Sequence, residues 1–224
     1  DCWCAAKRLT DTKNKRSVMK EITEIKKIGK GLRYDVYVDE QLLGTFEAEI
    51  LARHSLKTGQ SFDEDFFEEL KLENGDYACF NRSLGLLGKS MKTEKMLKDF
   101  LREKKYPRSS IDKAINKLKD YGYINDEAFC ENYINCYLSS KSRRKLKYDL
   151  LSKGVKEDII DEKLDELLPS TQERDNLLAL SEKFMRNRDF DQKTKQKFFS
   201  HFAGKGYDFS EISNVWEEIQ NGRN

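Results

Sequence analysis

Hydrophobic residues recur at helical spacing through most of the chain, most clearly between residues 121 and 155. Phe129, Tyr133 and Tyr137 follow one another every four residues, a spacing that lays one apolar stripe along a helix. Asn125 and Asp126 precede this stripe and offer an N-cap, because an Asx side chain accepts hydrogen bonds from the free amides of a first turn. The pattern predicts a helix that begins at this point.

Polar residues at 140–142 interrupt the stripe and can cap a second helix. Leu146 and Leu150 continue the apolar face along that helix. Lys153 and Gly154 then end it, because glycine commonly occupies the position that follows a helix C-terminus. The whole stretch therefore predicts the end of one helix, a tight turn and two further helices.

The apolar pattern of this stretch occurs three times in the chain. Shifting six positions of the middle copy back by 49 residues or forward by 52 finds an apolar or aromatic residue every time. The eighteen positions are Leu97, Leu101, Tyr106, Ile111, Ile115 and Leu118, then Leu146, Leu150, Val155, Ile160, Leu164 and Leu167, then Phe198, Phe202, Tyr207, Ile212, Trp216 and Ile219. This recurrence predicts three copies of a helical unit of about 50 residues, each needing a neighbour to cover its apolar face. Chance register of unrelated amphipathic helices is the alternative, and the match of all six positions in both comparisons disfavours it.

Ahead of these copies the hydrophobic period changes from 3.6 to 2. Residues 32–38 alternate strictly between apolar and polar side chains, and turn-forming residues lie at 29–31 and 39–41. Short alternating runs between turns predict a three-stranded antiparallel meander over residues 22–46. The glycines at 29–31 predict a hairpin turn and not a phosphate loop, since the Gly-Lys-Ser/Thr ending and the following helix are missing.

Helical patterns connect this meander to the repeats. Residues 47–56 favour one helix, which Gly59 ends, and Ser61 or Asp63 begins a second helix through Leu70. An acidic, glycine-containing passage follows. The predicted fold class is mainly α, with three tandem three-helix repeats after a small N-terminal β-rich (α+β) module. The expected parts are an extension or expression remnant at 1–18, the β-meander with helices at 19–76, and helical repeats at 77–125, 126–170 and 171–224.

Composition fits this organisation and limits the function. Charged residues make up 37% of the chain and only two residues are proline, which favours long, solvated helices in an elongated molecule. The net charge is +2, so nucleic-acid binding would have to come from local patches. No apolar run approaches the roughly 20 residues of a membrane helix, and no signal-peptide pattern is visible. We expect a cytoplasmic protein.

Basic residues gather at the same place in each repeat. They are Lys95, Lys98, Arg102 and Lys105 in the first repeat, Lys141, Arg143, Arg144, Lys145 and Lys147 in the second, and Lys193, Lys195 and Lys197 in the third. The first group has the spacing i, i+3, i+7 and i+10, which predicts four charges on one helix face. A single run of this kind is usually a solvated helix face. Three runs at equivalent positions favour a basic stripe that contacts a phosphate backbone or an acidic protein surface.

The chain carries none of the residue patterns of common catalytic sites. A nucleophile elbow, a His-Glu-x-x-His motif, a Cys-x-x-Cys pair and a glycine-rich nucleotide loop are all missing. The two histidines, His54 and His201, belong to different modules, and neither has an evident partner in the sequence. We expect a binding protein and not an enzyme, with no cofactor.

The five cysteines show no framework spacing, which is typical of a reducing cytosol. Cys130 and Cys136 are six residues apart on one predicted helix, which places them on different faces and favours core thiols over a redox pair. Cys2 and Cys4 could form half of a metal site, but no second pair of ligands follows at the required spacing. No metal is expected.

Over residues 22–219 the chain resembles the RecX family of bacterial recombination regulators. The resemblance lies in the run Tyr-Gly-Tyr-Ile-Asn-Asp-Glu at 121–127 with Ala128-Phe129, and in the paired Arg143 and Arg144 ahead of Leu146, Leu150 and residues 153–155. Residues 22–46 are similar to the extra N-terminal module of Gram-positive members.

Two departures from the family pattern affect partner contacts more than the fold. Lys141-Ser142 lies where the family usually has Gly-Pro, and Lys92-Thr93 with Met96 lies where it usually has Arg-Ser-x-x-Glu. Both changes keep a positive charge or a capping hydroxyl.

The resemblance implies an elongated, curved array of three three-helix repeats. It also implies a role in DNA repair, homologous recombination and the SOS response. A member of this family binds the RecA filament on single-stranded DNA, lies in its groove and modulates ATP hydrolysis and strand exchange, most simply by inhibition. We expect the RecA filament and single-stranded DNA as partners, with double-stranded DNA as a further option, and a monomer. The alternative is a helical-repeat protein that binds nucleic acid independently of RecA.

The repeat register makes a direct prediction for Leu150, which aligns with Leu101 and Phe202. Replacing Leu150 with alanine should lower the free energy of unfolding by about 2–5 kcal/mol, because the side chain would lie where three helices meet. Chemical denaturation measures the change. A loss below about 0.5 kcal/mol, typical of surface positions, would show that the register is wrong.

Overall fold

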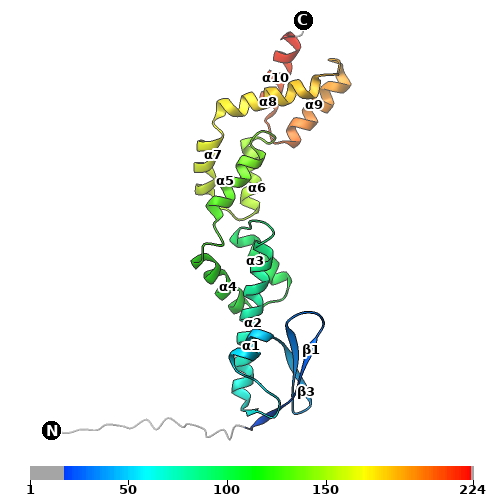
Figure 1. Cartoon of the computed structure of the whole chain (residues 1–224). Coiled ribbons are helices and arrows are strands. Elements are labelled where there is room, and N and C mark those ends of the chain that lie inside the picture. Colours follow the sequence, from blue (N-terminus) through cyan, green and yellow to red (C-terminus); the bar gives the residue numbers. More distant parts are fainter. Residues whose placement is uncertain (1–17, 223–224) are drawn as a thin grey trace, which may run out of the picture. The chain divides into compact units, whose positions relative to one another are not determined.

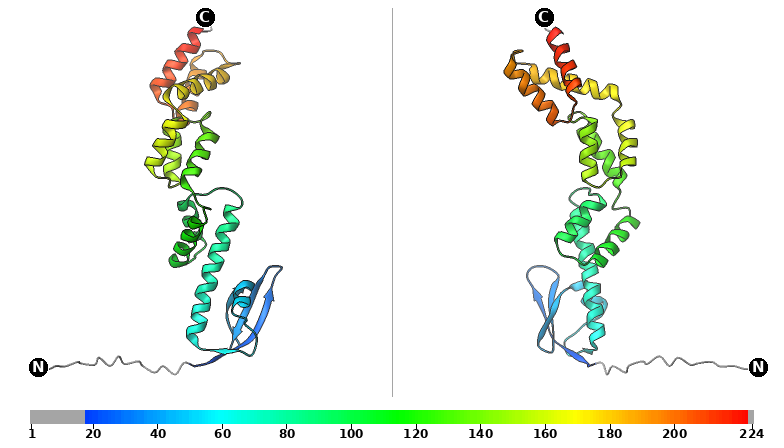
Figure 2. Two further views of the ribbon diagram at one scale, coloured as in Figure 1. Left: turned by 60° about the vertical axis from the view of Figure 1, so that its left-hand side comes forward. Right: turned by 180° about the vertical axis from the view of Figure 1, so that it is seen from behind.

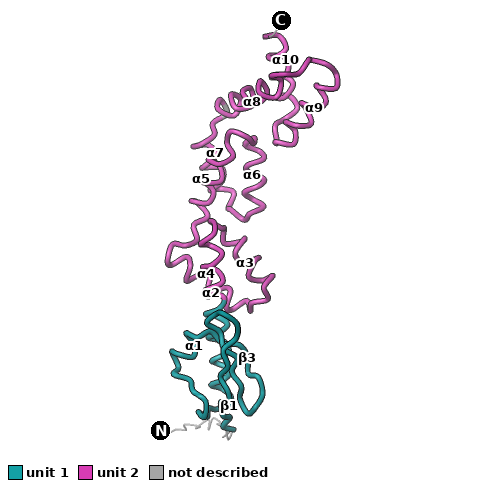
Figure 3. Tube along the Cα trace, turned by 45° about the vertical axis from the view of Figure 1, so that its right-hand side comes forward, with its two compact units in different colours: residues 1–78 teal, residues 79–224 magenta. Residues whose placement is uncertain are grey.

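The structure of the protein is a computed structural model that describes residues 18–222 (Figure 1). The expected N-terminal extension, with Cys2 and Cys4, therefore lies almost entirely outside the described residues. The chain forms two compact units, Asp1–Ala78 (unit 1) and Cys79–Asn224 (unit 2), coloured separately in Figure 3.

Unit 1 is built on an antiparallel sheet with the strand order β3-β2-β1-β4. Its strands are β1 (Lys20–Ile28), β2 (Arg33–Val38), β3 (Gln41–Glu47) and β4 (Ser61–Phe62). The first three form the predicted meander. Asp39 and Glu40, between β2 and β3, have φ angles of 48° and 66°, the positive values that a two-residue type I′ hairpin turn requires. The short strand β4 was not predicted, and it pairs with the start of β1.

Alternation along the strands places the core on one face of the sheet. Ile22 lies opposite Val38 in the β1–β2 pair, and both side chains are buried. Leu32, with which the alternation was predicted to begin, precedes β2 and is 68% exposed. The pattern was therefore one residue too long at its start.

Two helices complete unit 1 and differ from their predicted bounds. α1 (Ala48–Arg53) is shorter than expected. α2 (Glu64–Leu87) begins after Asp63, whose carboxylate accepts a hydrogen bond from the amide of Phe66 at 2.9 Å. The predicted end at Leu70 is wrong, because the helix continues through the acidic, glycine-containing passage (Figure 2).

Asn74 supplies the physical reason for this continuation. Its side-chain oxygen accepts from the amide of Glu47 at 2.9 Å, and its side-chain nitrogen donates to the carbonyl of Thr45 at 3.0 Å. The amide group thus bonds the free edge of β3 from the middle of α2. Such a tertiary contact outweighs the weak helix propensity of the Asn-Gly pair. The core of unit 1 consists of Ile22, Val36, Val38, Phe46, Ile50, Leu51, Leu56, Phe67 and Leu70.

Unit 2 contains three hydrophobic clusters, one for each helical repeat. The helices after α2 are α3 (Glu94–Glu103), α4 (Arg108–Asp120), α5 (Asp126–Tyr137), α6 (Arg143–Ser152), α7 (Glu157–Leu167), α8 (Ser170–Met185), α9 (Gln192–Gly204) and α10 (Phe209–Gly222). We call the second half of α2 with α3 and α4 repeat 1, α5 to α7 repeat 2, and α8 to α10 repeat 3. The predicted three-helix repeats are confirmed.

The apolar register predicted from the sequence holds at sixteen of the eighteen positions, which are buried. Leu146 and Leu150 are completely buried, as are Leu97 and Leu101 one repeat earlier. The two exceptions, Tyr106 and Leu167, are half-buried. In place of Leu167, the adjacent Leu168 is completely buried and occupies the core position.

The stripe predicted on α5 is displaced by one residue. Cys130 and Ile134 are completely buried, whereas Phe129 and Tyr133 are half-buried and Tyr137 is 39% exposed. The aromatic rings therefore line the margin of the core and not its centre, because the smaller side chains fit the space among the three helices. The different faces expected for Cys130 and Cys136 are confirmed, but Cys136 is exposed and is no core thiol.

We expect residues 77–224 to fold without the rest of the chain, because each repeat finds its core partners within the helices. A fragment from Tyr77 to Asn224 should show helical circular dichroism and a single cooperative melting transition. A non-cooperative melt would contradict this prediction and would show that the two units share one core.

Candidate functional site

The twelve basic residues predicted as a binding stripe lie mainly near the N-terminal ends of α3, α6 and α9. Two residues are exceptions: Arg102 lies in the last turn of α3, and Lys105 lies beyond the helix, because α3 ends at Glu103 and Lys104 forms its C-cap. Lys105 follows in the left-handed conformation, with φ of 62°. It therefore lies in the turn after α3 and not on the helix face with Lys95.

Repeats 1 and 2 are joined at the N-terminus of α3. The Thr93 hydroxyl donates to the carbonyl of Lys153 at 2.6 Å and accepts from the amide of Met96 at 3.2 Å. The Lys95 ammonium donates to the carbonyl of Ser152 at 2.9 Å. The last carbonyls of a helix lack partners within it, and here the first turn of α3 supplies donors for those of α6.

Repeats 2 and 3 are joined in the same way at the N-terminus of α6. The amide of Ser142 donates to the carbonyl of Lys205 at 3.0 Å, beyond the end of α9. The Arg144 guanidinium donates to the carbonyl of Gly206 at 3.1 Å and pairs with Asp208 at 2.6 Å. We call these two sets of contacts the repeat junctions.

Glycine is required at both repeat junctions. Gly154 and Gly206 have φ of 89° and 95°, values that other residues rarely adopt. A Cβ on Gly154 would overlap the side chain of Lys95, and one on Gly206 would overlap Ser142 and Lys145. The glycine therefore permits both the turn and the close approach of the preceding repeat.

Helix α8 adds two contacts to the second junction. The amide of Arg143 donates to the carboxylate of Glu173 at 2.7 Å, and the side chain of Asn176 donates to the carbonyl of Leu138 at 2.9 Å. Burial raises the pKa of Glu173 above its ordinary value, despite the hydrogen bond from Arg143.

Most of the predicted basic residues are paired with carboxylates. The pairs are Lys98 with Glu94 at 2.6 Å, Arg102 with Asp99 at 2.9 Å, Lys141 with Asp149 at 2.8 Å, Lys145 with Asp149 at 3.1 Å, Lys147 with Asp161 at 2.7 Å, Arg144 with Asp208 at 2.6 Å, and Arg143 with Asp165. Surface pairs of this kind contribute little stability, about 0–1 kcal/mol each. They do neutralise much of the charge on α3 and α6.

The pairing is tightest around Asp149, where Lys141 and Lys145 meet. Burial pushes the pKa of Asp149 upward, but hydrogen bonds from Lys141 and Lys145 outweigh it and hold that pKa below its ordinary value. Lys141 also contacts the hydroxyl of Tyr133 at 2.9 Å and lies 4.1 Å from the ring centroid of Tyr137. The ammonium of Lys141 thus ties α5 to α6 and is not a free cation.

Besides Lys95, whose ammonium donates to the carbonyl of Ser152, four of the predicted residues have no carboxylate within 4.0 Å among residues 18–222: Lys105, Lys193, Lys195 and Lys197. All four are exposed. Three of them lie in the first two turns of α9. Most of the predicted basic residues that have no carboxylate within 4.0 Å are therefore in repeat 3, a difference between the repeats that the sequence did not indicate.

Sequence reasoning missed two exposed aromatic residues near the second junction. Tyr148 in α6 is 67% exposed, and Phe209 at the start of α10 is 74% exposed. Neither residue is among the eighteen apolar positions that recur in the three repeats. That was the signal in the sequence that the two rings would lie outside the core.

The structure shows the surroundings of both histidines, for which no partner was evident in the sequence. His54 does have a partner, since its Nε2 lies 2.6 Å from a carboxylate oxygen of Glu73 in α2. His201 packs against the rings of Phe184 and Phe202, and burial lowers its pKa below the ordinary value. The hydrogen-bond and ring partners described for the two histidines include no nucleophilic side chain.

The part of the chain between residues 18 and 222 contains no cluster of three or more metal-ligating side chains. None of the helices in that part is both long and apolar enough to cross a membrane.

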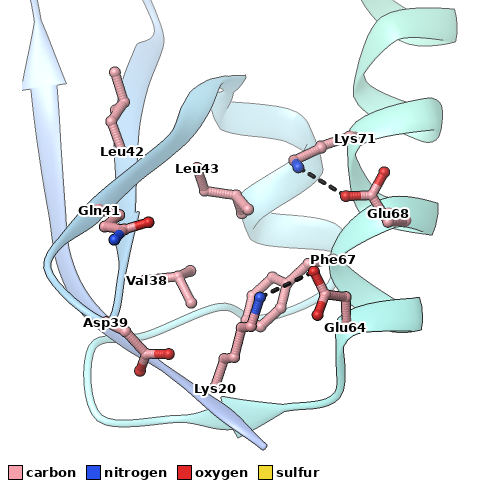
Figure 4. Close-up of a pocket in the computed structure, with 10 residues that line it drawn as sticks. All are labelled: Lys20, Val38, Asp39, Gln41, Leu42, Leu43, Glu64, Phe67, Glu68 and Lys71. Carbon is pink, nitrogen blue, oxygen red and sulfur yellow. Dashed lines mark hydrogen bonds and ion pairs between the residues drawn. The ribbon is translucent and has the colours of Figure 1, made fainter. Parts of the chain in front are cut away.

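A depression in unit 1 lies between the sheet and the first turns of α2, with a volume of about 380 Å³. Figure 4 shows Lys20 directed toward Glu64 and Lys71 toward Glu68 along its margin. These charges satisfy one another at 2.9 and 2.8 Å, so the depression offers a ligand few free polar groups.

Comparison with known proteins identifies the helical repeats. The family model for the RecX first three-helix domain matches residues 79–118, and the model for the RecX second three-helix domain matches residues 125–164. The regulatory protein RecX of Clostridium perfringens strain 13 is 34% identical over 193 residues, which cover 84% of this chain and 91% of the relative. The chain belongs to the RecX family.

Other RecX proteins agree with this assignment. The regulatory protein RecX of Clostridium acetobutylicum is 31% identical over 194 residues, covering 84% of this chain and 90% of the relative. A crystal structure of regulatory protein RecX has a TM-score of 0.59 at 23% identity, covering 90% of this chain and 99% of that one. A crystal structure of RecX from Lactobacillus salivarius has a TM-score of 0.55 at 24% identity, covering 66% and 98%. At these identities the two structures support the fold.

We predict that the junction glycines are sensitive to substitution. Gly206→Ala should lower the free energy of unfolding by about 2–4 kcal/mol, since the left-handed backbone costs about 1–2 kcal/mol and overlap with α6 adds to it. Gly122 is the matched control, because it has φ of 71° but no atom within 4 Å of an added Cβ.

For Gly122→Ala we expect only the backbone cost of about 1–2 kcal/mol. Denaturant unfolding of both variants gives the comparison. Equal losses at the two positions would contradict a close packing role for Gly206.

Proposed function

We propose that the protein binds the RecA filament on single-stranded DNA and inhibits its ATP hydrolysis and strand exchange. Membership of the RecX family is the observation that carries the proposal. The proposal also fits the scarcity of catalytic residue patterns among the described residues, because a protein that regulates by binding needs contact surfaces and not catalytic side chains. We propose no cofactor and no enzymatic activity.

The repeat construction supports binding to a polymeric partner. Three three-helix repeats joined by equivalent junctions present related surfaces in succession. A filament likewise repeats its own surface, so several individually weak contacts can act together and raise the overall affinity. A single compact site would not gain in this way.

The residues of the basic stripe differ in how far they are available to such a partner, because only some of them are held in ion pairs. Lys193, Lys195 and Lys197 are exposed and without carboxylate partners, whereas Arg143 and Arg144 are engaged in ion pairs and backbone contacts. A partner that contacts Arg144 would have to compete with Asp208. We therefore propose the three lysines of α9 as the main basic contact, and the remaining residues of the stripe as secondary contacts.

The competing function is nucleic-acid binding without the recombinase. The same lysines suit phosphate groups, so charge alone does not separate the two functions. Stoichiometry does separate them. A filament regulator acts at amounts well below one molecule per DNA site, whereas a competitor for DNA must coat the strand and would displace any single-strand binder.

The test is inhibition of RecA ATP hydrolysis on single-stranded DNA across a protein titration and a salt series. The variant with Lys193, Lys195 and Lys197 changed to glutamate should inhibit more weakly than the parent, and the difference should shrink as salt screens the charges. Because the three side chains are exposed, its melting temperature should stay close to that of the parent.

The matched control is a variant with Lys26, Lys27 and Lys30 changed to glutamate. These residues are also exposed and lie in the first hairpin of unit 1, so the net charge changes equally. Equal loss of inhibition in both variants would reveal a general charge effect and contradict the assignment to α9. Inhibition only at amounts that coat the DNA would favour the competing function.

A further inference from the structure

Two exposed aromatic side chains flank the junction of repeats 2 and 3. Phe209 is 74% exposed and Tyr148 is 67% exposed. Neither belongs to the hydrophobic clusters of its repeat. Phe209 is the most exposed of the large hydrophobic side chains among the described residues, so its ring presents a wide apolar surface at the junction.

Cationic side chains lie beside Tyr148. The Lys145 ammonium is 5.3 Å from the centroid of the Tyr148 ring. The backbone of Gly206 packs against the stem of the same lysine, and Arg144 donates to the carbonyl of Gly206. Contacts therefore lead directly from the Tyr148 ring to the turn that precedes Phe209.

On the other side of this turn, Phe209 packs against Phe199 with 4.9 Å between ring centroids. The Lys195 ammonium lies 5.8 Å from the centroid of Phe199, and Phe199 in turn contacts the buried Trp216. Phe209 is thus supported from beneath by the core of repeat 3. We call Arg144, Lys145, Tyr148, Lys195, Phe199 and Phe209 the junction face.

The acidic groups of the intervening turn are already engaged. Asp208 pairs with Arg144 at 2.6 Å, and Glu211 accepts from the amide of Asp208 at 3.0 Å. Lys145 shares Asp149 with Lys141, whereas Lys195 has no carboxylate partner among the described residues. The face therefore combines two available aromatic surfaces with cations, the combination by which proteins hold unpaired bases and their phosphates.

We propose that the junction face binds single-stranded nucleic acid directly, with unpaired bases stacked on Phe209 and Tyr148 and phosphates contacting Lys145 and Lys195. Bases inside a duplex are stacked on one another, so this mode of binding selects single strands. The proposal deepens the function proposed above and rests on it for the choice of ligand. Its test contains no recombinase, so the two can fail separately.

The experiment measures the affinity of the full chain for a fluorescent oligothymidine by anisotropy. Phe209→Ala and Tyr148→Ala should each weaken binding by about fivefold or more, the lower end of the effect of losing one stacked base. Phe209→Trp and Tyr148→Phe should keep most of the affinity, because they keep the aromatic surface. These two variants also preserve the test if an alanine variant fails to fold.

Tyr123→Ala is the matched control, because Tyr123 is 57% exposed and lies in repeat 1, outside the junction face. Its affinity should stay within about twofold of the parent. A second comparison uses duplex DNA of the same length, on which the loss of either ring should have little effect.

Several results would overturn the proposal: no binding of the oligothymidine by the parent, alanine variants within twofold of the parent, or an equal loss in Tyr123→Ala. An equal loss on duplex DNA would show that phosphates alone are bound. Inhibition of RecA by a parent chain that does not bind the oligothymidine would leave the proposed function standing and refute base stacking. Weaker inhibition by Phe209→Ala with unchanged oligothymidine affinity would assign the face to a protein partner instead.

Discussion

The helical unit depends on one kind of contact, the bonding of one helix end by the beginning of another. The carbonyls at the end of α6 accept from Thr93 and Lys95, and the turn after α9 is bonded by Ser142 and Arg144. Each junction satisfies groups that a helix cannot satisfy within itself. Hydrogen bonds are directional. The junctions therefore restrict which helix start can lie against which helix end more strongly than apolar packing alone would.

The same contacts explain the distribution of charge. Basic residues at the start of α3 and α6 serve the junctions or neutralise nearby carboxylates, as Lys95 and Lys147 do. Among the described residues the start of α9 bonds no other helix end, and Lys193, Lys195 and Lys197 have no carboxylate within 4.0 Å. Equivalent sequence positions therefore have different roles, depending on whether their helix begins against the end of another helix.

Periodicity predicted the helical repeats well, because burial of an apolar face follows directly from spacing along one helix. Leu101, Leu150 and Phe202 are all completely buried, and the caps at Asn125 and Ser142 form as expected. These features depend on residues only a few positions apart, and such local spacing can be read directly from the sequence.

Features that depend on distant residues were not predictable in the same way. The continuation of α2 past Leu70 relies on Asn74 bonding β3, and the pairing of Arg144 relies on Asp208 in the next repeat. The sequence suggested the basic stripe from its residue types and spacing, but it could not tell which cations would be paired with carboxylates. The exposure of Phe209 likewise depends on which face of α10 the core of repeat 3 uses.

Lys105 distinguishes repeat 1 from the two repeats that follow it. It occupies the place in repeat 1 that Gly154 and Gly206 occupy in the next two repeats, and it holds the left-handed conformation despite its side chain. A fourth three-helix unit added ahead of repeat 1 would need to bring its own first turn against this residue, where the Cβ of lysine would obstruct it. A junction like those at Gly154 and Gly206 would therefore require glycine in place of Lys105.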